Sequence, residues 1–326
     1  MAKTPVYGGE EEMSQLIVLN GQIVEVEEAN VSVLDRANLF GDGLYEVIRC
    51  YTGGLFEHGT HVERLLDGAA ALGITHDWTR ESLESAARRL QAETGIMEGE
   101  MYIQLSRGPA VRSHYFPDSQ SPTIFITLYP VRPIPPDACT AGTSVITCPD
   151  MRHGWCHLKT VNLLSNCLAK EKAHRHGVWE GLMLRGLDRT TLPGSVEEYC
   201  DAPGELSSVS PGDKFAGYVT EGASANVFVV KDGRIATPPR ENILPGVTRR
   251  ITLELANRAG YEVKERRVLA EELLVADEVF LTSTVGEIMP VVNIDGHLVG
   301  AGEPGPITRR LASMYTERVA SAKLRG

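Results

Sequence analysis

One lysine stands apart from the others in this chain. The segment 156–164, "CHLKTVNLL", places Lys159 among apolar neighbours just before a predicted helix, whereas the other seven lysines lie in tails, turns, charged runs or polar segments. Desolvation favours the neutral form of a lysine amine, and the neutral amine is the nucleophile. Lys159 is therefore a candidate for forming a Schiff base with an aldehyde. The local sequence is equally compatible with a lysine that extends from a strand edge into water.

Three further segments of the C-terminal half carry groups that would suit one cofactor. "LPGVTRR" places Val247 and Thr248 at a predicted helix start, where backbone N–H groups favour a phosphate. "LTSTVGE" ends a predicted strand with the hydroxyls of Ser283 and Thr284, and "YVTEGASANVF" places Glu221 on an apolar strand, where a carboxylate needs a partner. Taken singly, these are a helix cap, a polar strand end and a surface glutamate. Together with a reactive amine, they are what pyridoxal 5′-phosphate (PLP) requires.

The order and spacing of the motifs resemble the class IV aminotransferases of fold type IV, and most closely the bacterial D-amino acid (D-alanine) aminotransferases. The segments that carry the resemblance are "LFGDGLYEVIRCY", "HVERL", "YIQLSRGPAVRSHYFPD", "LKTVNLLSNCLAKEKAHRHG", "VTEGASANVF", "ILPGVTR" and "EVFLTSTVGEIMPVV". The resemblance runs from about Leu16 to the C-terminal helix and leaves out residues 1–13 and 186–216.

The resemblance implies a set of cofactor-binding residues. Lys159 would be the Schiff-base lysine and proton shuttle, Glu221 would keep the pyridine nitrogen protonated, and Arg64 of "HVERL" would bind the phosphate. The remaining implied positions are Val247, Thr248, Ser283 and Thr284 at the phosphate, Leu244 on the cofactor ring with Ser224 beside it, and Arg152 in a supporting role.

Substrate recognition is expected from the loop Arg112-Ser113-His114. The resemblance implies that an Arg-x-His pair here binds the substrate α-carboxylate, and branched-chain enzymes of the same fold lack it. A guanidinium and an imidazole two residues apart on an extended segment can converge on one carboxylate, although a plain surface loop is the alternative. Asn38 stands where the family motif "R-x-Y-x-F-G-D-G" has a tyrosine, so we expect a weaker carboxylate grip.

The elements that must position these residues alternate between hairpins and helices. Asn20-Gly21 and Asp232-Gly233 indicate tight hairpin turns. Helical spacing, with start and stop residues, predicts helices within 60–74, 79–95, 162–177, 245–260 and 305–322. The expected fold class is α+β or mixed α/β, a two-domain, D-amino acid aminotransferase-like fold with mixed sheets and flanking helices.

The predicted domain organisation has four parts. Residues 1–13 form a flexible arm, 14–131 a small N-terminal α/β domain, 132–137 a proline-rich linker, and 138–326 a larger PLP-binding domain. Residues 186–216 are rich in Gly, Pro, Ser and acidic residues and read as an insertion. We expect this insertion to be a surface excursion rather than an active-site lid.

Composition excludes several classes of protein. The chain has 326 residues and a net charge of −11, which argues against a nucleic-acid partner, and it contains no apolar run long enough to span a membrane. The N-terminus lacks the order of a signal peptide, so six reduced cysteines and a cytoplasmic location are expected. No histidine or cysteine spacing matches a zinc site, and no metal is expected.

The sequence therefore predicts a PLP-dependent aminotransferase that acts on D-amino acids, with 2-oxoglutarate or pyruvate as acceptor. A homodimer is expected from the resemblance alone. The alternatives are an L-branched-chain aminotransferase, an (R)-selective amine transaminase, which Asn38 would favour, and an aminodeoxychorismate lyase. A non-catalytic PLP-fold binding or regulatory protein is the alternative from another class.

Overall fold

The computed structural model describes residues 15–52, 54–131, 134, 137–187 and 193–323, and it divides into two compact units. The N-terminal unit comprises residues 1–133, 158–162 and 319–326, and the C-terminal unit comprises 134–157 and 163–318. The predicted arm 1–13 lies outside the described residues, as do 132–133 and 135–136 of the predicted linker. The mixed α/β content agrees with the expected fold class.

The segment 158–162 differs from the prediction that 138–326 is one continuous domain, because it belongs to the N-terminal unit. The Tyr45 N–H donates to the Lys159 carbonyl at 2.9 Å, and the Val161 N–H donates to the Gly43 carbonyl at 3.1 Å. The five residues thus add to the edge of a strand that lies more than a hundred positions earlier in the sequence.

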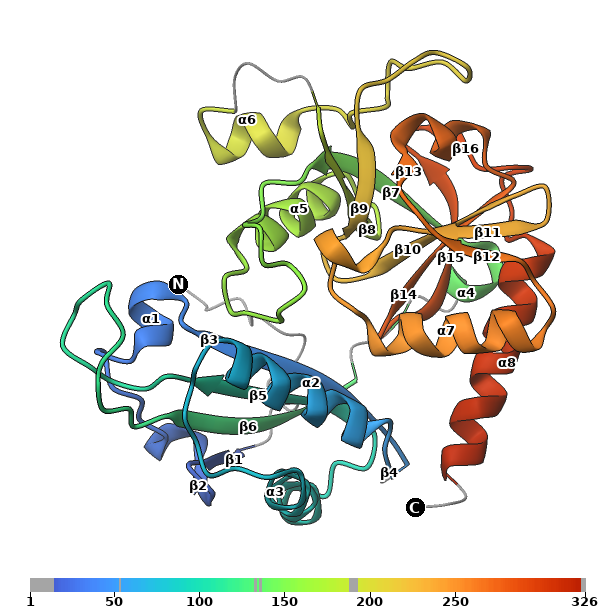
Figure 1. Ribbon diagram of the computed structural model, residues 1–326. Helices are drawn as coiled ribbons and strands as arrows, with labels where there is room; N and C mark the ends of the chain where they lie inside the picture. Colours follow the sequence, from blue (N-terminus) through green and yellow to red (C-terminus); the bar gives the residue numbers. More distant parts are fainter. Residues whose placement is uncertain (1–14, 53, 132–133, 135–136, 188–192, 324–326) are drawn as a thin grey trace, which may run out of the picture. The chain divides into compact units, whose positions relative to one another are not determined.

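The N-terminal unit is a six-stranded sheet in the order β2-β1-β6-β5-β3-β4 (Figure 1). Its strands are β1 (Leu16–Leu19), β2 (Gln22–Glu25), β3 (Gly43–Tyr51), β4 (Gly54–Leu55), β5 (Gly99–Ser106) and β6 (Thr123–Pro130). Its helices are η1 (Val26–Glu28), α1 (Arg36–Phe40), α2 (His58–Ala71) and α3 (Arg80–Thr94). Alternate residues of the long strands, such as Ile48 and Ile103, pack with Leu65 of α2 and Leu90 of α3 in one buried cluster. The two helices therefore cover one face of this sheet.

Local signals account for these elements. Asn20 and Gly21 have φ values of 48° and 87°, the left-handed conformation that the predicted hairpin turn requires. Thr79 caps α3, its side chain accepting from the Ser82 N–H while the Ser82 side chain accepts from the Thr79 N–H, and Gly95 ends the helix in the left-handed region.

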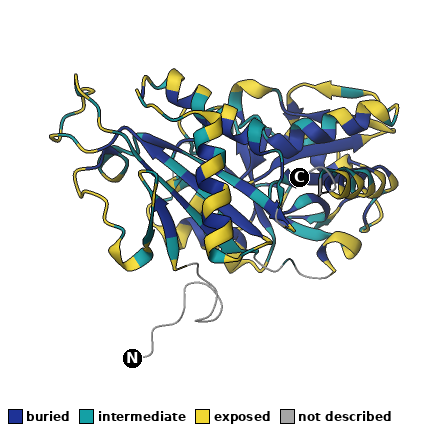
Figure 2. Cartoon of the chain, turned by 90° about the horizontal axis from the view of Figure 1, so that it is seen from below, coloured by how far each residue is buried: buried dark blue, intermediate teal, exposed yellow. Residues whose placement is uncertain are grey.

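The C-terminal unit is a ten-stranded mixed sheet in the order β12-β11-β10-β14-β15-β7-β8-β9-β13, with β16 paired to β15. Its strands are β7 (Thr143–Pro149), β8 (Glu180–Arg185), β9 (Tyr218–Gly222), β10 (Asn226–Lys231), β11 (Arg234–Thr237), β12 (Val263–Glu265), β13 (Val268–Leu269), β14 (Glu278–Ser283), β15 (Glu287–Ile294) and β16 (His297–Leu298). Its helices are α4 (Ala138–Ala141), α5 (Leu164–Arg175), α6 (Val196–Asp201), η2 (Arg240–Asn242), α7 (Val247–Arg258), η3 (Ala270–Val275) and α8 (Pro306–Lys323), the last of which continues into the residues grouped with the N-terminal unit. Figure 2 shows buried residues along the strands and exposed residues on the outer faces of the helices.

The insertion 186–216 is more than a surface excursion in its described part. It contains α6, which is capped by the Ser195 hydroxyl. Tyr199 and Cys200 of this helix are buried in a cluster with Cys148 and Met183, and Leu206 joins the main core of the unit. The insertion is therefore attached to the core of the unit by a few apolar side chains, which its acidic, glycine-rich composition does not indicate.

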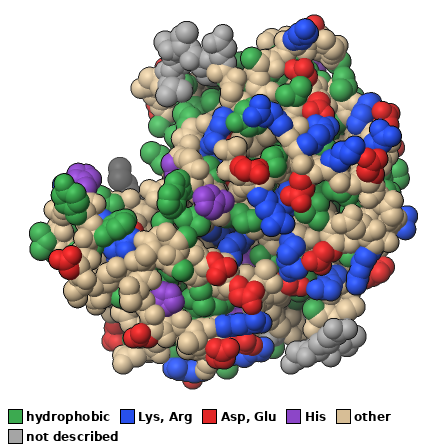
Figure 3. Space-filling model, viewed as in Figure 1, with side chains coloured by type: hydrophobic (Ala, Val, Ile, Leu, Met, Phe, Trp, Pro, Cys, Tyr) green, Lys and Arg blue, Asp and Glu red, His purple; other side chains and the backbone are tan. Residues whose placement is uncertain are grey.

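The described residues contain no helix that is long and apolar enough to cross a membrane, and no group of His, Cys, Asp or Glu side chains that could hold a metal. On the face shown in Figure 3, acidic and basic side chains are interspersed. This face therefore does not present one continuous basic surface of the kind that binds a phosphate backbone.

Candidate functional site

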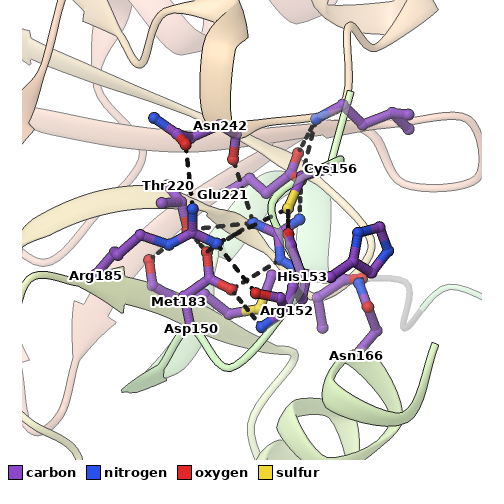
Figure 4. Close-up of polar contacts among 12 residues, drawn as sticks. Asp150, Arg152, His153, Cys156, Asn166, Met183, Arg185, Thr220, Glu221 and Asn242 are labelled. Atoms are coloured by element: carbon purple, nitrogen blue, oxygen red, sulfur yellow. Dashed lines mark hydrogen bonds and ion pairs between the residues drawn. The ribbon is translucent and has the colours of Figure 1, made fainter. Parts of the chain in front are cut away.

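Glu221 is the centre of a buried polar network in the C-terminal unit (Figure 4). It lies near the end of β9 and is 5% exposed. Its Oε1 forms a very short ion pair with Nη1 of Arg152, and its Oε2 accepts from the Asn226 amide at 2.8 Å. The Leu244 N–H also donates to both carboxylate oxygens, at 3.1 and 3.2 Å. The carboxylate is therefore held by donors from three separate segments.

A second carboxylate orients Arg152. Asp150 accepts from Arg152 Nε at 3.0 Å and from Nη2 at 2.9 Å, and it also accepts from the Thr220 hydroxyl at 2.9 Å. Nη2 of Arg185 lies 3.0 Å from the same Asp150 oxygen, and Nη1 donates to the Asn242 side chain at 3.1 Å. Two carboxylates and two guanidiniums thus alternate in space, so that each buried charge has an opposite neighbour.

Burial raises the pKa of Glu221, and the Arg152 guanidinium opposes that rise. For Asp150 burial acts in the same direction, but the hydrogen bonds and charges of Arg152 and Arg185 hold its pKa below the usual value. The geometry gives Glu221 the donors needed to keep it ionised, which is the state that can pair with a protonated ring nitrogen.

A helix start suited to an anion lies in the same unit. The N-cap of α7 is Gly246, and no side chain caps the helix, so the N–H groups of Val247 and Thr248 begin it without a side-chain acceptor. Asn226, which donates to the carbonyl of Leu244 at 2.9 Å, pairs across the sheet with Thr282. The buried hydroxyl of Thr282 has no hydrogen-bond partner among the described residues. Ser283 ends β14, and its hydroxyl accepts from the Gly286 N–H at 2.9 Å, while Thr284 follows it.

Ser224 joins a different pair of charged residues. Its hydroxyl donates to Glu180 Oε2 at 2.7 Å, and the Lys170 ammonium lies 3.0 Å from the same oxygen. Glu180 is 1% exposed, whereas Ser224 is exposed. The sequence pattern indicated Ser224 but not Glu180, which begins a strand that reads as apolar.

Lys159 lies in the N-terminal unit, half-buried. Its carbonyl is fixed to the Tyr45 N–H, and its Nζ lies 4.3 Å from the centre of the Tyr45 ring. The amine of Lys159 thus lies over an aromatic face, which attracts its charged form.

Arg64 is held by the deeply buried carboxylate of Glu46. Arg64 Nε donates to Glu46 Oε1 at 2.7 Å, and Nη2 donates to Oε2 at 2.8 Å. His61 Nδ1 lies 2.8 Å from Oε2, so His61 is a second partner of this carboxylate. Burial alone would raise the pKa of Glu46, but Arg64 and His61 lower it to about 2. Arg64 is thereby a permanently charged, oriented guanidinium.

Arg112 and His114 meet at one ring. The Arg112 guanidinium carbon lies 5.5 Å from the centre of the Phe40 ring, and the rings of His114 and Phe40 are 5.5 Å apart. Both side chains are exposed. Asn38 is also exposed, and its amide donates to the Ser32 carbonyl at 3.2 Å, so this donor is used within its own loop.

The structure thus collects the predicted residues in separate groups. Glu221, Arg152 and Leu244 share one network, Arg112 and His114 share Phe40, and Lys159 and Arg64 belong to the same unit. The residues that sequence analysis missed are Tyr45, Glu46, His61, Asp150, Arg185 and Asn226. The sequence could have indicated that His61 lies beside Arg64, because residues three apart in a predicted helix share one face.

Comparisons with known proteins agree on one family. A family model described as "Amino-transferase class IV" matches residues 43–189 and 215–294, so most of the insertion falls between its matched parts. The chain is 35% identical over 306 residues to a D-alanine aminotransferase of Bacillus licheniformis, covering 94% of this chain and 97% of the relative. It is 36% identical over 306 residues to a D-alanine aminotransferase of Staphylococcus epidermidis, covering 94% and 98%.

Solved structures of branched-chain amino acid aminotransferases share the fold. The Escherichia coli protein has a TM-score of 0.77 at 28% identity and covers 93% of this chain and 94% of that one. A T.th. protein with pyridoxamine 5′-phosphate has a TM-score of 0.78 at 28% identity and covers 95% of each chain. These likenesses agree with the expected fold type IV.

Class IV aminotransferases use PLP, and the residues of this chain fit that cofactor. The uncapped start of α7 and the buried, unpartnered hydroxyl of Thr282 among the described residues suit a phosphate, and the triply held Glu221 suits a pyridinium. With the family model matched over most of the chain and the described groups in place, the chain belongs to the class IV aminotransferases and is a PLP-dependent aminotransferase.

Proposed function

We propose that this enzyme transfers the amino group of D-amino acids, with D-alanine as the model donor, to a 2-oxo acid such as 2-oxoglutarate or pyruvate. The observation that carries the proposal is the pair Arg112 and His114. Both lie on one exposed loop, and both contact the ring of Phe40 at the end of α1. A guanidinium and an imidazole together suit a carboxylate, which every amino acid and 2-oxo acid carries. The D-alanine aminotransferases at 35–36% identity support the same substrate class.

The proposed roles follow from the geometry of each group. Lys159 would hold the cofactor and take the proton from the substrate Cα, and bound PLP would supply the electron sink for the carbanion. Glu221 would hold a proton at the pyridine nitrogen, with Arg152 and Asn226 fixing its oxygens. The remaining proposed contacts are Arg64, Val247, Thr248, Ser283 and Thr284 at the phosphate, with Leu244 on the ring and Ser224 beside it.

The structure adds a residue beside the Lys159 amine that sequence analysis did not identify. Asn38 donates to the Ser32 carbonyl, whereas Tyr45 lies beside the Lys159 amine. We therefore assign Tyr45 as the side chain that flanks the reacting amine, whereas Asn38 keeps its expected place at the substrate carboxylate. Because the Asn38 amide already donates to Ser32, a weaker carboxylate grip is still expected, and an (R)-selective amine transaminase stays an alternative.

A second candidate function is transamination of L-branched-chain amino acids. Its support is the fold similarity to branched-chain aminotransferases, with TM-scores of 0.77 and 0.78. The identity to those proteins is 28%, below the 35–36% to the D-alanine aminotransferases. The higher identity and the Arg112/His114 pair favour the D-amino acid substrate.

A homodimer and a cytoplasmic location complete the proposal. Val33, Val111 and Tyr115 are 80%, 87% and 86% exposed, and the Ala110 N–H donates to the Leu34 carbonyl, which joins the two segments that carry them. Apolar exposure of this kind is typical of protein interfaces. The six cysteines are free thiols, as expected in a reducing compartment. Sedimentation equilibrium would show a species of twice the chain mass, and a monomer at all concentrations would contradict the dimer.

The experiment that tests the substrate class is a half-reaction without acceptor. Purified, PLP-loaded enzyme is mixed with D-alanine, L-leucine or (R)-1-phenylethylamine, and the visible absorption band of the bound cofactor is followed. Rapid loss of the band with D-alanine alone is expected. Loss chiefly with L-leucine would establish the second candidate, and loss chiefly with the amine would contradict a carboxylate site. A Lys159→Ala variant that kept its biological activity would support a non-catalytic binding protein instead.

A further inference from the structure

In the N-terminal unit, Arg36 links the exposed loop 111–118 to a buried cluster formed by Asp42 and Arg107. Arg36 begins α1 and is 3% exposed. Its Nη1 donates to the Ser113 carbonyl at 2.7 Å and to the Tyr115 carbonyl at 3.3 Å, so it contacts the backbone on both sides of His114. Its guanidinium also lies 4.7 Å from the centre of the Phe40 ring, which is the ring that Arg112 and His114 share.

The loop has few other attachments. Among the described residues, both hydrogen bonds that join the backbone of 111–118 to the rest of the chain come from Arg36. The side chains of Val111, Tyr115 and Phe116 are mostly exposed. The Phe116 ring stacks on the Arg107 guanidinium, which lies 3.8 Å from the centre of the ring. Within one chain, the position of this loop therefore depends on Arg36 more than on packing.

Asp42 fixes Arg36 in turn. Arg36 Nε donates to Asp42 Oδ2 at 2.7 Å, and Arg107 donates to the same carboxylate at 2.8 and 3.1 Å. Arg107 is 1% exposed and also donates to the carbonyls of Leu72 and Gly73, at 2.8 Å each. Burial alone would raise the pKa of Asp42, but the two arginines hold it below its usual value. The Asp42/Arg107 cluster that holds Arg36 is thus charged and rigid.

We propose that Arg36 is a positioning residue for the substrate-carboxylate site, acting through the backbone of the loop that carries Arg112 and His114. The inference rests on the proposed function. Arg36 itself need not touch the substrate to act in this way, because its Nε donates to Asp42 and its Nη1 donates to the loop carbonyls. Without Arg36, the side chains of Arg112 and His114 would still be present, but their loop would no longer be held in one position. A misplacement of about 1 Å can lower catalytic efficiency on the order of 100-fold.

The test compares Arg36→Met and Arg36→Lys with the wild-type enzyme, using steady-state kinetics with D-alanine. We expect KM to rise about 10- to 100-fold for Arg36→Met with kcat changed less than about threefold, because carboxylate binding is loosened while Lys159 is untouched. Arg36→Lys keeps the charge beside Asp42 but cannot reach Asp42 and both carbonyls together, so an intermediate KM is expected. Arg88→Met, which removes an exposed arginine paired with Glu84, is the matched control and should leave both constants unchanged.

A double-variant cycle separates positioning from a general defect. In an Arg112→Ala background, Arg36→Met should change KM by less than about threefold, since Arg112, the permanently charged one of the two residues that it positions, is gone. An unchanged KM in Arg36→Met, or a full additional KM rise in the Arg112→Ala background, would overturn the inference. The PLP absorption band and thermal midpoint of each variant identify unfolding, in which case the cycle is judged on Arg36→Lys.

The proposed function can fail independently of this inference. If the wild-type enzyme does not use D-alanine, the substrate proposal is wrong, and the same cycle is run with whichever carboxylate donor it accepts. Arg36 then still positions the loop if the KM effect vanishes in the Arg112→Ala background.

Discussion

The network around Glu221 and the loop around Arg112 solve the same problem, holding charged groups in place, by opposite means. Glu221 is buried, and its oxygens accept from Arg152, Asn226 and the Leu244 N–H. Arg112 is exposed, and its loop is joined to the chain by two hydrogen bonds from Arg36. A buried carboxylate without its donors would be very costly, whereas an exposed arginine costs little in any position. Cofactor residues should therefore tolerate almost no change, and substrate residues should be exchangeable without loss of the fold.

The largest effect is expected at a residue outside both regions. Lys159→Ala should lower kcat for D-alanine by about 10⁴-fold or more, because it removes the group that we assign to proton transfer and cofactor attachment. Single-turnover absorbance measurements on PLP-loaded protein would check this. Lys231→Ala is the matched control, since Lys231 is an exposed lysine paired with Asp277. A Lys159→Ala enzyme with kcat within about tenfold of the wild type would contradict the assignment.

The next effect would test the buried region. Glu221→Gln should lower kcat by about 10²- to 10³-fold, since the proton at the ring nitrogen is no longer held. It should also reduce the free energy of unfolding by about 3 kcal/mol, because Arg152 loses one of its two carboxylate partners while it stays buried. Chemical denaturation of the apo-protein would separate the second effect from the first. An unchanged free energy of unfolding would show that Arg152 does not depend on Glu221 for its stability in the buried network.

Arg112→Ala makes the corresponding change in the exposed region. We expect KM for D-alanine to rise about 10- to 100-fold, as for the loss of a charged hydrogen-bonding group, while the free energy of unfolding changes by less than about 0.5 kcal/mol. The contrast with Glu221→Gln is the comparison in its sharpest form. If Arg112→Ala destabilised the enzyme as much as Glu221→Gln does, the distinction between the two regions would be lost.

Glu46→Gln probes a buried carboxylate in the N-terminal unit, where the comparison predicts behaviour like that of Glu221. Removing its charge frees Arg64, so the dissociation constant for PLP should rise about tenfold, the loss of roughly one charge-assisted contact. Equilibrium dialysis with PLP measures this without any turnover. Glu84→Gln, at a half-buried position of α3 where Glu84 pairs with Arg88, should leave the constant unchanged. An unaltered constant in Glu46→Gln would separate Arg64 from the phosphate.

The smallest effect concerns pH. His58 is 5% exposed, neither ring nitrogen has a hydrogen-bond partner among the described residues, and burial lowers its pKa from 6.5 to about 4. The unfolded chain therefore takes up a proton below pH 6.5 that the folded chain refuses until about pH 4, so stability falls as the pH is lowered through this window. The loss should be about 2 kcal/mol, measured by chemical denaturation at a series of pH values. In His58→Gln the fall should become smaller by this amount, because the pKa values of His61 and His153 are also lowered by burial, and in His174→Gln, an exposed control, the fall should be unchanged.

Sequence reasoning recovered the parts of this molecule that local chemistry determines. The turn at Asn20-Gly21, the capped helix from Thr79 to Gly95 and the uncapped start of α7 each depend on a few adjacent residues. The motif spacing also indicated the family and the cofactor. What could not be predicted is long-range pairing, such as the addition of 158–162 to β3.

The missed site residues share one property. Glu46, Asp150 and Asn226 lie in apolar or unremarkable segments, and their roles appear only when the chain brings Arg64, Arg152 or Glu221 to them. The assignment of Asn38 rests on motif position, and no local signal indicated that its amide would donate to Ser32.

The insertion has a consequence for how this fold can grow. Residues 186–217 connect two strands, β8 and β9, that pair antiparallel and could be joined by a few residues. Loop-closure entropy rises only with the logarithm of length, so a roughly eightfold longer connection costs about 2 kcal/mol more. Burying one large apolar side chain contributes a similar amount, and both Tyr199 and Leu206 are buried. This connection is therefore a point at which added sequence can be retained at little thermodynamic cost, while the sheet on either side keeps its register.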